Sequence, residues 1–296
     1  MRGAAEKWGE SPPVRLRIGL VLSGGGGKGT YQLGALRALE EHGLARKISV
    51  ISGCSIGAYN ALLYACGGIP CAREFMFRFH DLMESCPETP APQVEARRQA
   101  LSGPSALTAF ETDPTLWQYR NTGLRSYLSH VLEENKGAWR QTRLYACAYC
   151  LERERPEYFC LGDLSDAEVV DAVVASGSLP YVFPPVRIGD VCYTDGGVVP
   201  DRCIDPVPCD KIPLHPILQE NLDIILAIFL NPADRVDHSQ VQRGTRYLEL
   251  RPSMPLEPSP RAGTLDFQPE HLRWREELGY RDAAELLLSC EGRAIW

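Results

Sequence analysis

The sequence predicts an α/β protein with a mostly parallel central sheet and helices on both faces. Residues 15–22 (RLRIGLVL) form a short aliphatic run that ends in glycines, as a buried strand does. Leucines then recur at helical spacing within residues 29–42, before a glycine that ends the helix. A second apolar run at residues 48–51 precedes a helix through residues 59–66. This strand–helix–strand–helix order is typical of a parallel sheet wrapped by helices.

The remaining elements follow from the same patterns of apolar residues and turn residues. Further strands are expected at residues 143–150, 158–161, 223–230 and 247–250. Further helices are expected at residues 74–83, 167–176 and 269–290. Residues 86–104 are rich in proline and charge, which indicates an exposed loop or lid. We expect a flexible N-terminal segment, residues 1–14, and then one domain, residues 15–296, with a middle insertion or lid at about 70–137.

Composition narrows the class of protein and of partner. The chain has 296 residues, which is long enough to form a stable core without covalent cross-links. Its net charge of −7 argues against nucleic acid as a partner. The 11 cysteines are scattered, often within apolar runs, which favours free buried thiols in the cytoplasm over a disulfide framework. The N-terminus lacks the features of a signal peptide, and no apolar run approaches the roughly 18 residues that span a bilayer. Any membrane contact is therefore expected to be transient, local and apolar.

A glycine-rich loop, residues 23–30 (SGGGGKGT), lies between the first strand and the first helix. It does not fit a P-loop, because Leu22 occupies the first glycine position and Gly29 replaces the serine or threonine. The dinucleotide fingerprint fits Gly24, Gly26 and Gly29, but the second strand lacks the acidic residue that binds a ribose hydroxyl. The third interpretation is an oxyanion hole, in which backbone N–H groups receive negative charge from a carbonyl oxygen. The loop by itself does not distinguish these three functions from one another, or from a loop that only allows close packing.

A second motif, Gly53-Cys-Ser55-Ile-Gly57, also joins a strand to a helix. In a G-x-S-x-G elbow, a sharp turn raises the serine oxygen above the carboxyl edge of the sheet, and the two glycines relieve the crowding. Both loops are expected side by side at adjacent strand ends, where open α/β sheets bind ligands. Ser55 is therefore the candidate nucleophile.

The serine needs a base within hydrogen-bond reach. The six histidines are His42, His80, His130, His215, His238 and His271, and none follows a predicted strand beside glycine. Asp195 does, because it ends the apolar run of residues 191–195 and precedes Gly196 and Gly197. An aspartate in this position often does no more than stabilise a turn. Next to Ser55, however, a partly desolvated carboxylate gains basicity and accepts the hydroxyl proton.

Taken together, the three motifs at residues 24–29, 53–57 and 195–197 resemble the patatin-like phospholipase family, which is marked by G-G-G-x-[RK]-G, G-x-S-x-G and D-G-[GA]. The likeness runs from about Arg17 to Asn231 and includes the approach to the aspartate at residues 175–197. It implies a modified α/β-hydrolase-type architecture with a Ser–Asp dyad.

The resemblance assigns the site residue by residue. It implies Ser55 as nucleophile, Asp195 as base, and Gly25 and Gly26 as oxyanion donors with Gly27 as a helper. Lys28 holds the family's basic position, where it is expected to bind a lipid phosphate, although lysine lacks the bidentate geometry of arginine. The family often has asparagine after D-G-G, where this chain has Asp201.

The expected function is that of a serine lipid acyl hydrolase, of phospholipase A or esterase type, which cleaves carboxylic esters through an acyl-enzyme. No cofactor and no metal is expected, because Cys147-x-x-Cys150 has no second close pair and its thiols point to opposite faces of a strand. The alternatives are a His-dependent esterase, a nucleotide-binding module and an idle scaffold. Phe75, Phe77 and Phe79 either form an apolar rim for a lipid surface or pack in the core.

Overall fold

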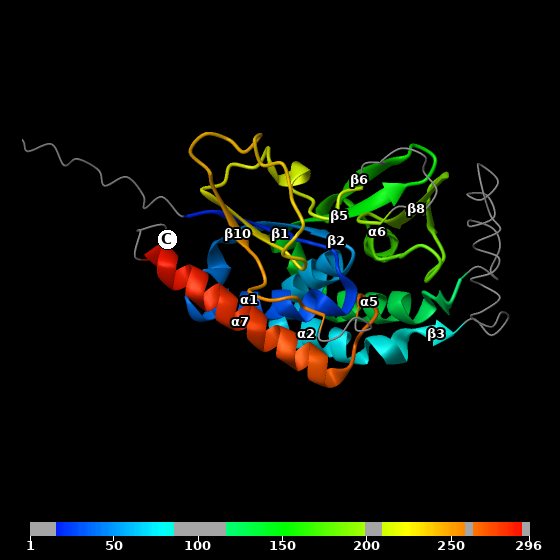
Figure 1. The fold of residues 1–296 in the computed structure, drawn as a ribbon. Coiled ribbons are helices and arrows are strands. Elements are labelled where there is room, and N and C mark those ends of the chain that lie inside the picture. The colour runs from blue at the N-terminus through cyan, green and yellow to red at the C-terminus, as the bar shows by residue number, and fades with distance from the viewer. Residues whose placement is uncertain (1–15, 86–116, 199–208, 258–262, 292–296) are drawn as a thin grey trace, which may run out of the picture.

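The computed structural model describes residues 16–85, 117–198, 209–257 and 263–291, which fold around one central sheet (Figure 1). The segment expected to be flexible at 1–14, the loop expected at 86–104, and Asp201 lie outside the described residues.

The main sheet has eight strands in the order β10-β9-β1-β2-β5-β8-β7, with β6 also paired to β5. The strands are β1 (Ile18–Leu22), β2 (Ile48–Cys54), β5 (Arg143–Cys150), β6 (Arg155–Cys160), β7 (Val186–Ile188), β8 (Val191–Asp195), β9 (Ile224–Ile228) and β10 (Arg246–Leu250). The neighbours from β10 to β5 are parallel, whereas β6, β8 and β7 pair antiparallel. A separate two-stranded ribbon joins β3 (Glu84–Ser85) to β4 (Tyr119–Arg120).

In the described ranges, five α-helices gather against one face of this sheet. They are α1 (Thr30–Glu41), α2 (Ile56–Leu82), α5 (Thr122–Asn135), α6 (Asp166–Ser176) and α7 (Pro269–Glu291). Alternate strand residues such as Leu20 and Leu22 join the buried apolar cluster that these helices form. Figure 1 shows α7 running beside α1 across this layer. The α/β class and the mostly parallel sheet are therefore confirmed.

The opposite face differs from the expectation of helices on both sides. In the part of the chain that the structure describes, it is covered by residues 211–222, whose Ile212, Leu214 and Ile217 pack on Val21 of β1 and Val50 of β2. The segment contains a single 3-10 turn, η6 (His215–Ile217). Its two prolines each remove a backbone donor, which disfavours a longer helix and explains the irregular cover.

The helices expected at residues 59–66 and 74–83 are both present, on either side of a kink at Gly67 and Gly68, and together they form α2. Gly67 and Gly68 have non-helical dihedral angles, but α2 resumes beyond them and reaches Leu82. The expected start of an insertion near residue 70 lies close to this kink. Phe75 in this second half is fully buried in the main apolar cluster, as is Leu128 of α5, a helix that the sequence patterns did not predict.

No helix in the four described ranges combines the length and the apolar character needed to cross a bilayer.

Candidate active site

Neighbouring strand ends bring the predicted site residues together. The glycine loop leaves β1 and Ser55 follows β2, two parallel strands that pair in register with Leu22 opposite Gly53. Asp195 ends β8, and β5 lies between β8 and β2 in the sheet. β8 runs antiparallel to β5 and places Asp195 opposite Ala148, one residue beyond Cys147, which lies opposite Cys54 of β2. Segments far apart in the sequence therefore meet at one pocket.

The pocket has a volume of about 160 Å³ and two kinds of wall. Its polar wall contains Gly24, Gly25, Gly26, Ser55, Asp195 and Gly197. Its apolar wall includes Ile56, Tyr59, Phe79, Leu124, Leu179 and Phe183. Reacting groups and an apolar surface therefore face the same space, as a site for an ester with an apolar tail requires.

Ser55 sits in a strained turn. Its φ of 55° and ψ of −126° lie in a region that non-glycine residues rarely adopt. A Cβ at Gly53 would lie 2.4 Å from the carbonyl carbon of Gly57, and one at Gly57 would lie 2.2 Å from the carbonyl oxygen of Leu22. Both positions of the elbow therefore require glycine. The Ser55 N–H donates to Ser176 Oγ at 2.8 Å, which fixes the turn from α6.

Asp195 is 2% exposed, lines the same pocket as Ser55, and lies close enough to the Ser55 side chain for that side chain to lower its pKa. Its Oδ1 also accepts the Gly197 N–H at 2.9 Å. Burial raises the pKa of Asp195 to about 6, against the opposing effects of the Ser55 and Gly197 hydrogen bonds and of the Lys211 charge. A carboxylate of this pKa is ionised at neutral pH, yet is more basic than an exposed aspartate.

The glycine loop lies directly against the elbow, because a Cβ at Gly24 would be 3.2 Å from Ser55 Cβ. Among the described residues, no acceptor takes the N–H of Gly25 or Gly26, and both residues line the pocket. The Gly27 N–H instead donates to the Thr264 carbonyl at 2.8 Å. The helper role expected of Gly27 therefore finds no support, since its donor is already used. Gly29 is packed against α2 and Gly196 against Cys147 of β5.

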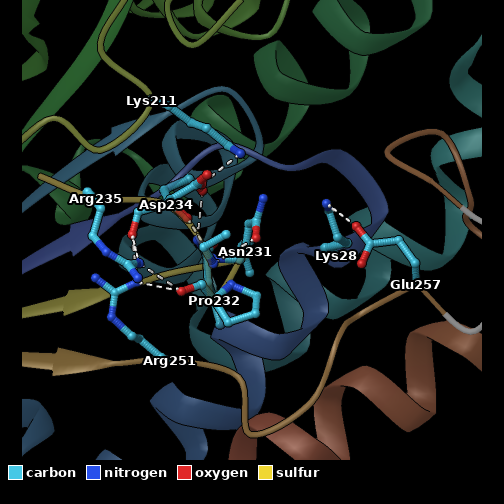
Figure 2. Close-up of polar contacts among 12 residues, drawn as sticks. Lys28, Lys211, Asn231, Pro232, Asp234, Arg235, Arg251 and Glu257 are labelled. Atoms are coloured by element: carbon cyan, nitrogen blue, oxygen red, sulfur yellow. Dashed lines mark hydrogen bonds and ion pairs between the residues drawn. The ribbon is translucent and has the colours of Figure 1, made fainter.

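Lys28 does not line the pocket, contrary to its expected role in binding phosphate. Its side chain is 8% exposed, and its Nζ lies 2.7 Å from Glu257 Oε1 (Figure 2). An ammonium group that is buried and neutralised by a carboxylate is poorly placed to bind a second anion. Glu257 lies 229 residues away in the sequence, so no local pattern announces this pair.

Among the described residues, Lys211 is the cation that lines the pocket, although no sequence motif predicts it. Its backbone carbonyl accepts the Gly24 N–H at 3.0 Å, and its Nζ lies 2.8 Å from Asp234 Oδ2 (Figure 2). No motif surrounds it, so sequence reasoning had no signal to use.

None of the six histidines lines the pocket. His42, for example, bonds the Ala38 carbonyl within its own helix, His238 stacks on Tyr247, and His271 pairs with Asp266. Within the described ranges, no group of three or more His, Cys, Asp or Glu residues is arranged to hold a metal ion. Of the three phenylalanines considered as a rim, Phe75 is a core residue and Phe79 faces the pocket.

Known proteins share parts of this sequence. The family model for patatin-like phospholipases matches residues 20–208. A lysophospholipase NTE1 of Kluyveromyces lactis is 27% identical over 228 residues, which is 73% of this chain and 13% of that protein. A lysophospholipase nte1 of Aspergillus terreus is 54% identical over 48 residues, 16% of this chain and 3% of that protein. The chain thus spans a small part of these relatives.

Solved structures with a similar chain course include VipD from Legionella pneumophila, with a TM-score of 0.46 and 16% identity over 93% of this chain and 67% of that one. A human GIVD cytosolic phospholipase A2 gives a TM-score of 0.43 and 11% identity over 95% of this chain and 59% of that one.

Proposed function

Because the chain belongs to the patatin-like phospholipase family, we propose that it hydrolyses carboxylic esters of lipids, with Ser55 as the nucleophile and Asp195 as its base. One observation carries this proposal. Ser55 and the buried carboxyl group of Asp195 line one pocket, which is also lined by Gly25 and Gly26, and no acceptor among the described residues takes the backbone N–H of either glycine. A nucleophile, a base and an oxyanion site within one pocket are the parts that acyl transfer needs.

In the first step, Asp195 accepts the Ser55 proton while Oγ forms a bond to the ester carbonyl carbon. The carbonyl oxygen becomes an oxyanion, and the N–H groups of Gly25 and Gly26 are the donors proposed for it. Donors of this kind supply about 2.7–4 kcal/mol each. Because they belong to a short loop held between β1 and α1, they are positioned before the charge develops.

The tetrahedral intermediate then collapses, the bond between carbonyl carbon and alkoxy oxygen breaks, and Asp195 returns its proton to the departing alcohol. An acyl-Ser55 ester remains. In the second half of the reaction, Asp195 takes a proton from water while the water oxygen bonds to the acyl carbon. The bond between that carbon and the Ser55 oxygen then breaks, and Asp195 returns the proton to Ser55. A pKa of about 6 suits both directions, since the carboxylate must accept and release a proton near neutrality.

The apolar wall of the pocket supports a lipid acyl group as the part of the substrate that binds there. The mouth supports contact with a lipid surface, because Val198 and Leu265 both line the pocket and are 41% and 39% exposed. Large exposed apolar side chains beside a site favour an interface with apolar matter. We expect Val198→Asp and Leu265→Asp to reduce sedimentation with phosphatidylcholine vesicles. Leu288→Asp is the control, at a leucine that is 62% exposed but does not line the pocket.

The decisive test is covalent labelling with an alkyl fluorophosphonate, followed by peptide mass spectrometry. Wild-type protein should gain the label on Ser55 and hydrolyse acyl esters, Ser55→Ala should do neither, and Asp195→Asn should label far more slowly while remaining folded. Labelling at another serine, or full activity of Asp195→Asn, contradicts the proposal.

Two of the three alternative functions, a His-dependent esterase and a nucleotide-binding module, are tested alongside. His215→Ala, His238→Ala and His271→Ala should each retain hydrolysis, whereas loss in one of them with Asp195→Asn still active would establish a His-dependent esterase. NAD and ATP should leave the melting temperature unchanged, and a rise would favour the nucleotide-binding interpretation of the glycine loop.

A further inference from the structure

One part of the pocket wall comes from outside the region that the family model matches. Thr264, Leu265 and Phe267 line the pocket, although the match ends at residue 208. These residues belong to a short segment, residues 263–267, that directly precedes α7. The motifs of the family therefore build the reacting groups, while this C-terminal segment builds part of the space that the substrate must occupy.

Phe267 lines the pocket and stacks on Phe79, which lines it as well. The two rings are nearly parallel, with an interplanar angle of 8° and centroids 4.1 Å apart, and the side chains are 3% and 7% exposed. Phe79 in turn meets the edge of Phe75 at 5.5 Å, and Phe75 stacks on Tyr59 at 5.0 Å. This continuous aromatic series ties one side of the wall to the rigid core, so the wall yields little to an incoming chain.

Arg275 of α7 fixes the other side of the wall. This arginine is 0% exposed, and it donates to the Asp266 carbonyl at 2.7 Å, to Asp266 Oδ2 at 2.7 Å and to the Leu256 carbonyl at 2.9 Å. His271 Nδ1 also lies 2.8 Å from Asp266 Oδ2. A planar guanidinium held by several acceptors is geometrically specific, so the residue next to Phe267 is strongly constrained.

The same segment also holds the glycine loop, through the Gly27 N–H bond to the Thr264 carbonyl. The glycine loop and the apolar wall of the pocket are thus fixed relative to one another. The pocket volume of about 160 Å³ is below the roughly 300–1,000 Å³ of most small-molecule sites. An acyl chain that reacts at Ser55 has limited room before it meets the wall.

We propose that Phe267, stacked on Phe79, is a specificity-determining residue that limits the length of the acyl chain the pocket accepts, and that Arg275 is its positioning residue through Asp266. The proposal deepens the proposed ester hydrolysis and rests on it. It predicts that the natural substrates are esters of short or medium acyl chains.

The test compares Phe267→Ala and Phe267→Trp with wild type, using esters of butanoic, octanoic and dodecanoic acid with one common alcohol. One methylene in an apolar pocket is worth about tenfold or more in kcat/KM. We therefore expect Phe267→Ala to raise the ratio of dodecanoate to butanoate turnover by about tenfold, and Phe267→Trp to lower it. Phe77→Ala is the matched control, because Phe77 is on the same helix as Phe79 but does not line the pocket.

If Phe267 only supported packing, its replacement would lower turnover of all three esters and leave their ratios unchanged. Opposite shifts of the dodecanoate-to-butanoate ratio in Phe267→Ala and Phe267→Trp therefore distinguish a role in specificity from a role in packing. Unchanged ratios in both Phe267 variants overturn the proposal. Rates of Ser55 labelling by ethyl and dodecyl fluorophosphonate give the same ratio without turnover. If wild-type Ser55 is not labelled at all, the proposed hydrolysis fails. If it is labelled but the ratio does not move with residue 267, only the wall proposal fails.

Arg275 is tested through its partner, because Asp266→Asn keeps the shape and removes the charge. We expect Asp266→Asn to shift the chain-length ratio in the same direction as Phe267→Ala. Arg73→Gln is the control, since it breaks an ion pair with Glu276 of the same helix α7 that lies outside the pocket. Equal ratios for Asp266→Asn and wild type overturn the positioning role.

Discussion

The hydroxyl of Ser176 accepts the backbone N–H of Ser55 at 2.8 Å and donates to the Cys147 carbonyl at 2.6 Å. One buried side chain thereby joins the end of α6, the strand β5 and the turn that presents the candidate nucleophile. The positive φ of Ser55 persists only where surrounding contacts hold it. Ser176 is thus a support of the elbow and does not face the substrate.

Ser176→Ala should lower both stability and the chemical rate. It leaves a backbone N–H and a backbone carbonyl without their partner, which costs about 1–3 kcal/mol when such groups are buried. The relaxed elbow moves the nucleophile, so kcat should fall more than KM changes. Urea unfolding and steady-state kinetics measure the two effects.

Ser178→Ala is the matched control for that variant. Ser178 is equally buried, but its hydroxyl donates only to the Val174 carbonyl within the end of α6. It should lose little stability and keep its kcat. Equal kcat values in the two variants would show that Ser176 does not position the elbow.

The rate of hydrolysis should depend on one ionisation near pH 6. Burial raises the pKa of Asp195 to about 6, and only the ionised carboxylate accepts the Ser55 proton. On a neutral ester, kcat/KM should therefore fall about tenfold per pH unit below about pH 6 and level off above it. A profile that is flat through pH 6, or that turns near the ordinary aspartate value of 3.8, contradicts this assignment.

The same carboxylate should make the wild-type protein less stable as the pH rises. Between pH 3.8 and about 6 the folded protein keeps a proton on Asp195 that the unfolded chain has lost. The stabilisation from this proton is full below pH 3.8 and disappears as the pH passes 6. A difference of about two pH units corresponds to about 3 kcal/mol.

Asp195→Asn removes this titration and leaves the others in place. Relative to wild type, its free energy of unfolding should therefore increase by about 3 kcal/mol between acid and neutral pH. Urea unfolding of both proteins across this range measures the difference. Two curves that stay parallel would mean that Asp195 has no raised pKa.

Gly26→Ala should abolish activity by displacing the glycine loop. Gly26 has a φ of 56°, and a Cβ there would lie 2.0 Å from the Thr264 carbonyl oxygen, so either the loop or residues 263–267 must move. Gly43→Ala is the control for backbone strain alone, because Gly43 has a φ of 69° with nothing within 4 Å of the added carbon. It should lose only about 1 kcal/mol of stability and keep full activity. Similar activity in both variants would exclude the clash as the cause.

Much of the fold follows from local patterns. The strand β1, the glycine loop and α1 are readable in order, because a buried strand, a glycine turn and an amphipathic helix each leave a mark within a few residues. The sharp turn at Ser55 is readable for the same reason, since its two glycines are needed by contacts within the elbow and with the adjacent strand. The break in α2 at Gly67 and Gly68 is readable as well, because these glycines leave the helical dihedral angles and a second helical stretch begins after them.

The sequence by itself determined the family, the order of the three motifs and the residue types available for acyl transfer, because these are carried by short contiguous stretches. Only the tertiary structure decided that Lys28 is neutralised by Glu257, that the Gly27 N–H is used by Thr264, and that Phe267 meets Phe79 across the pocket. Each of these is a contact between residues about 190 or more positions apart. Such pairs are chosen by how the folded layers pack, and packing leaves no periodic pattern along the chain.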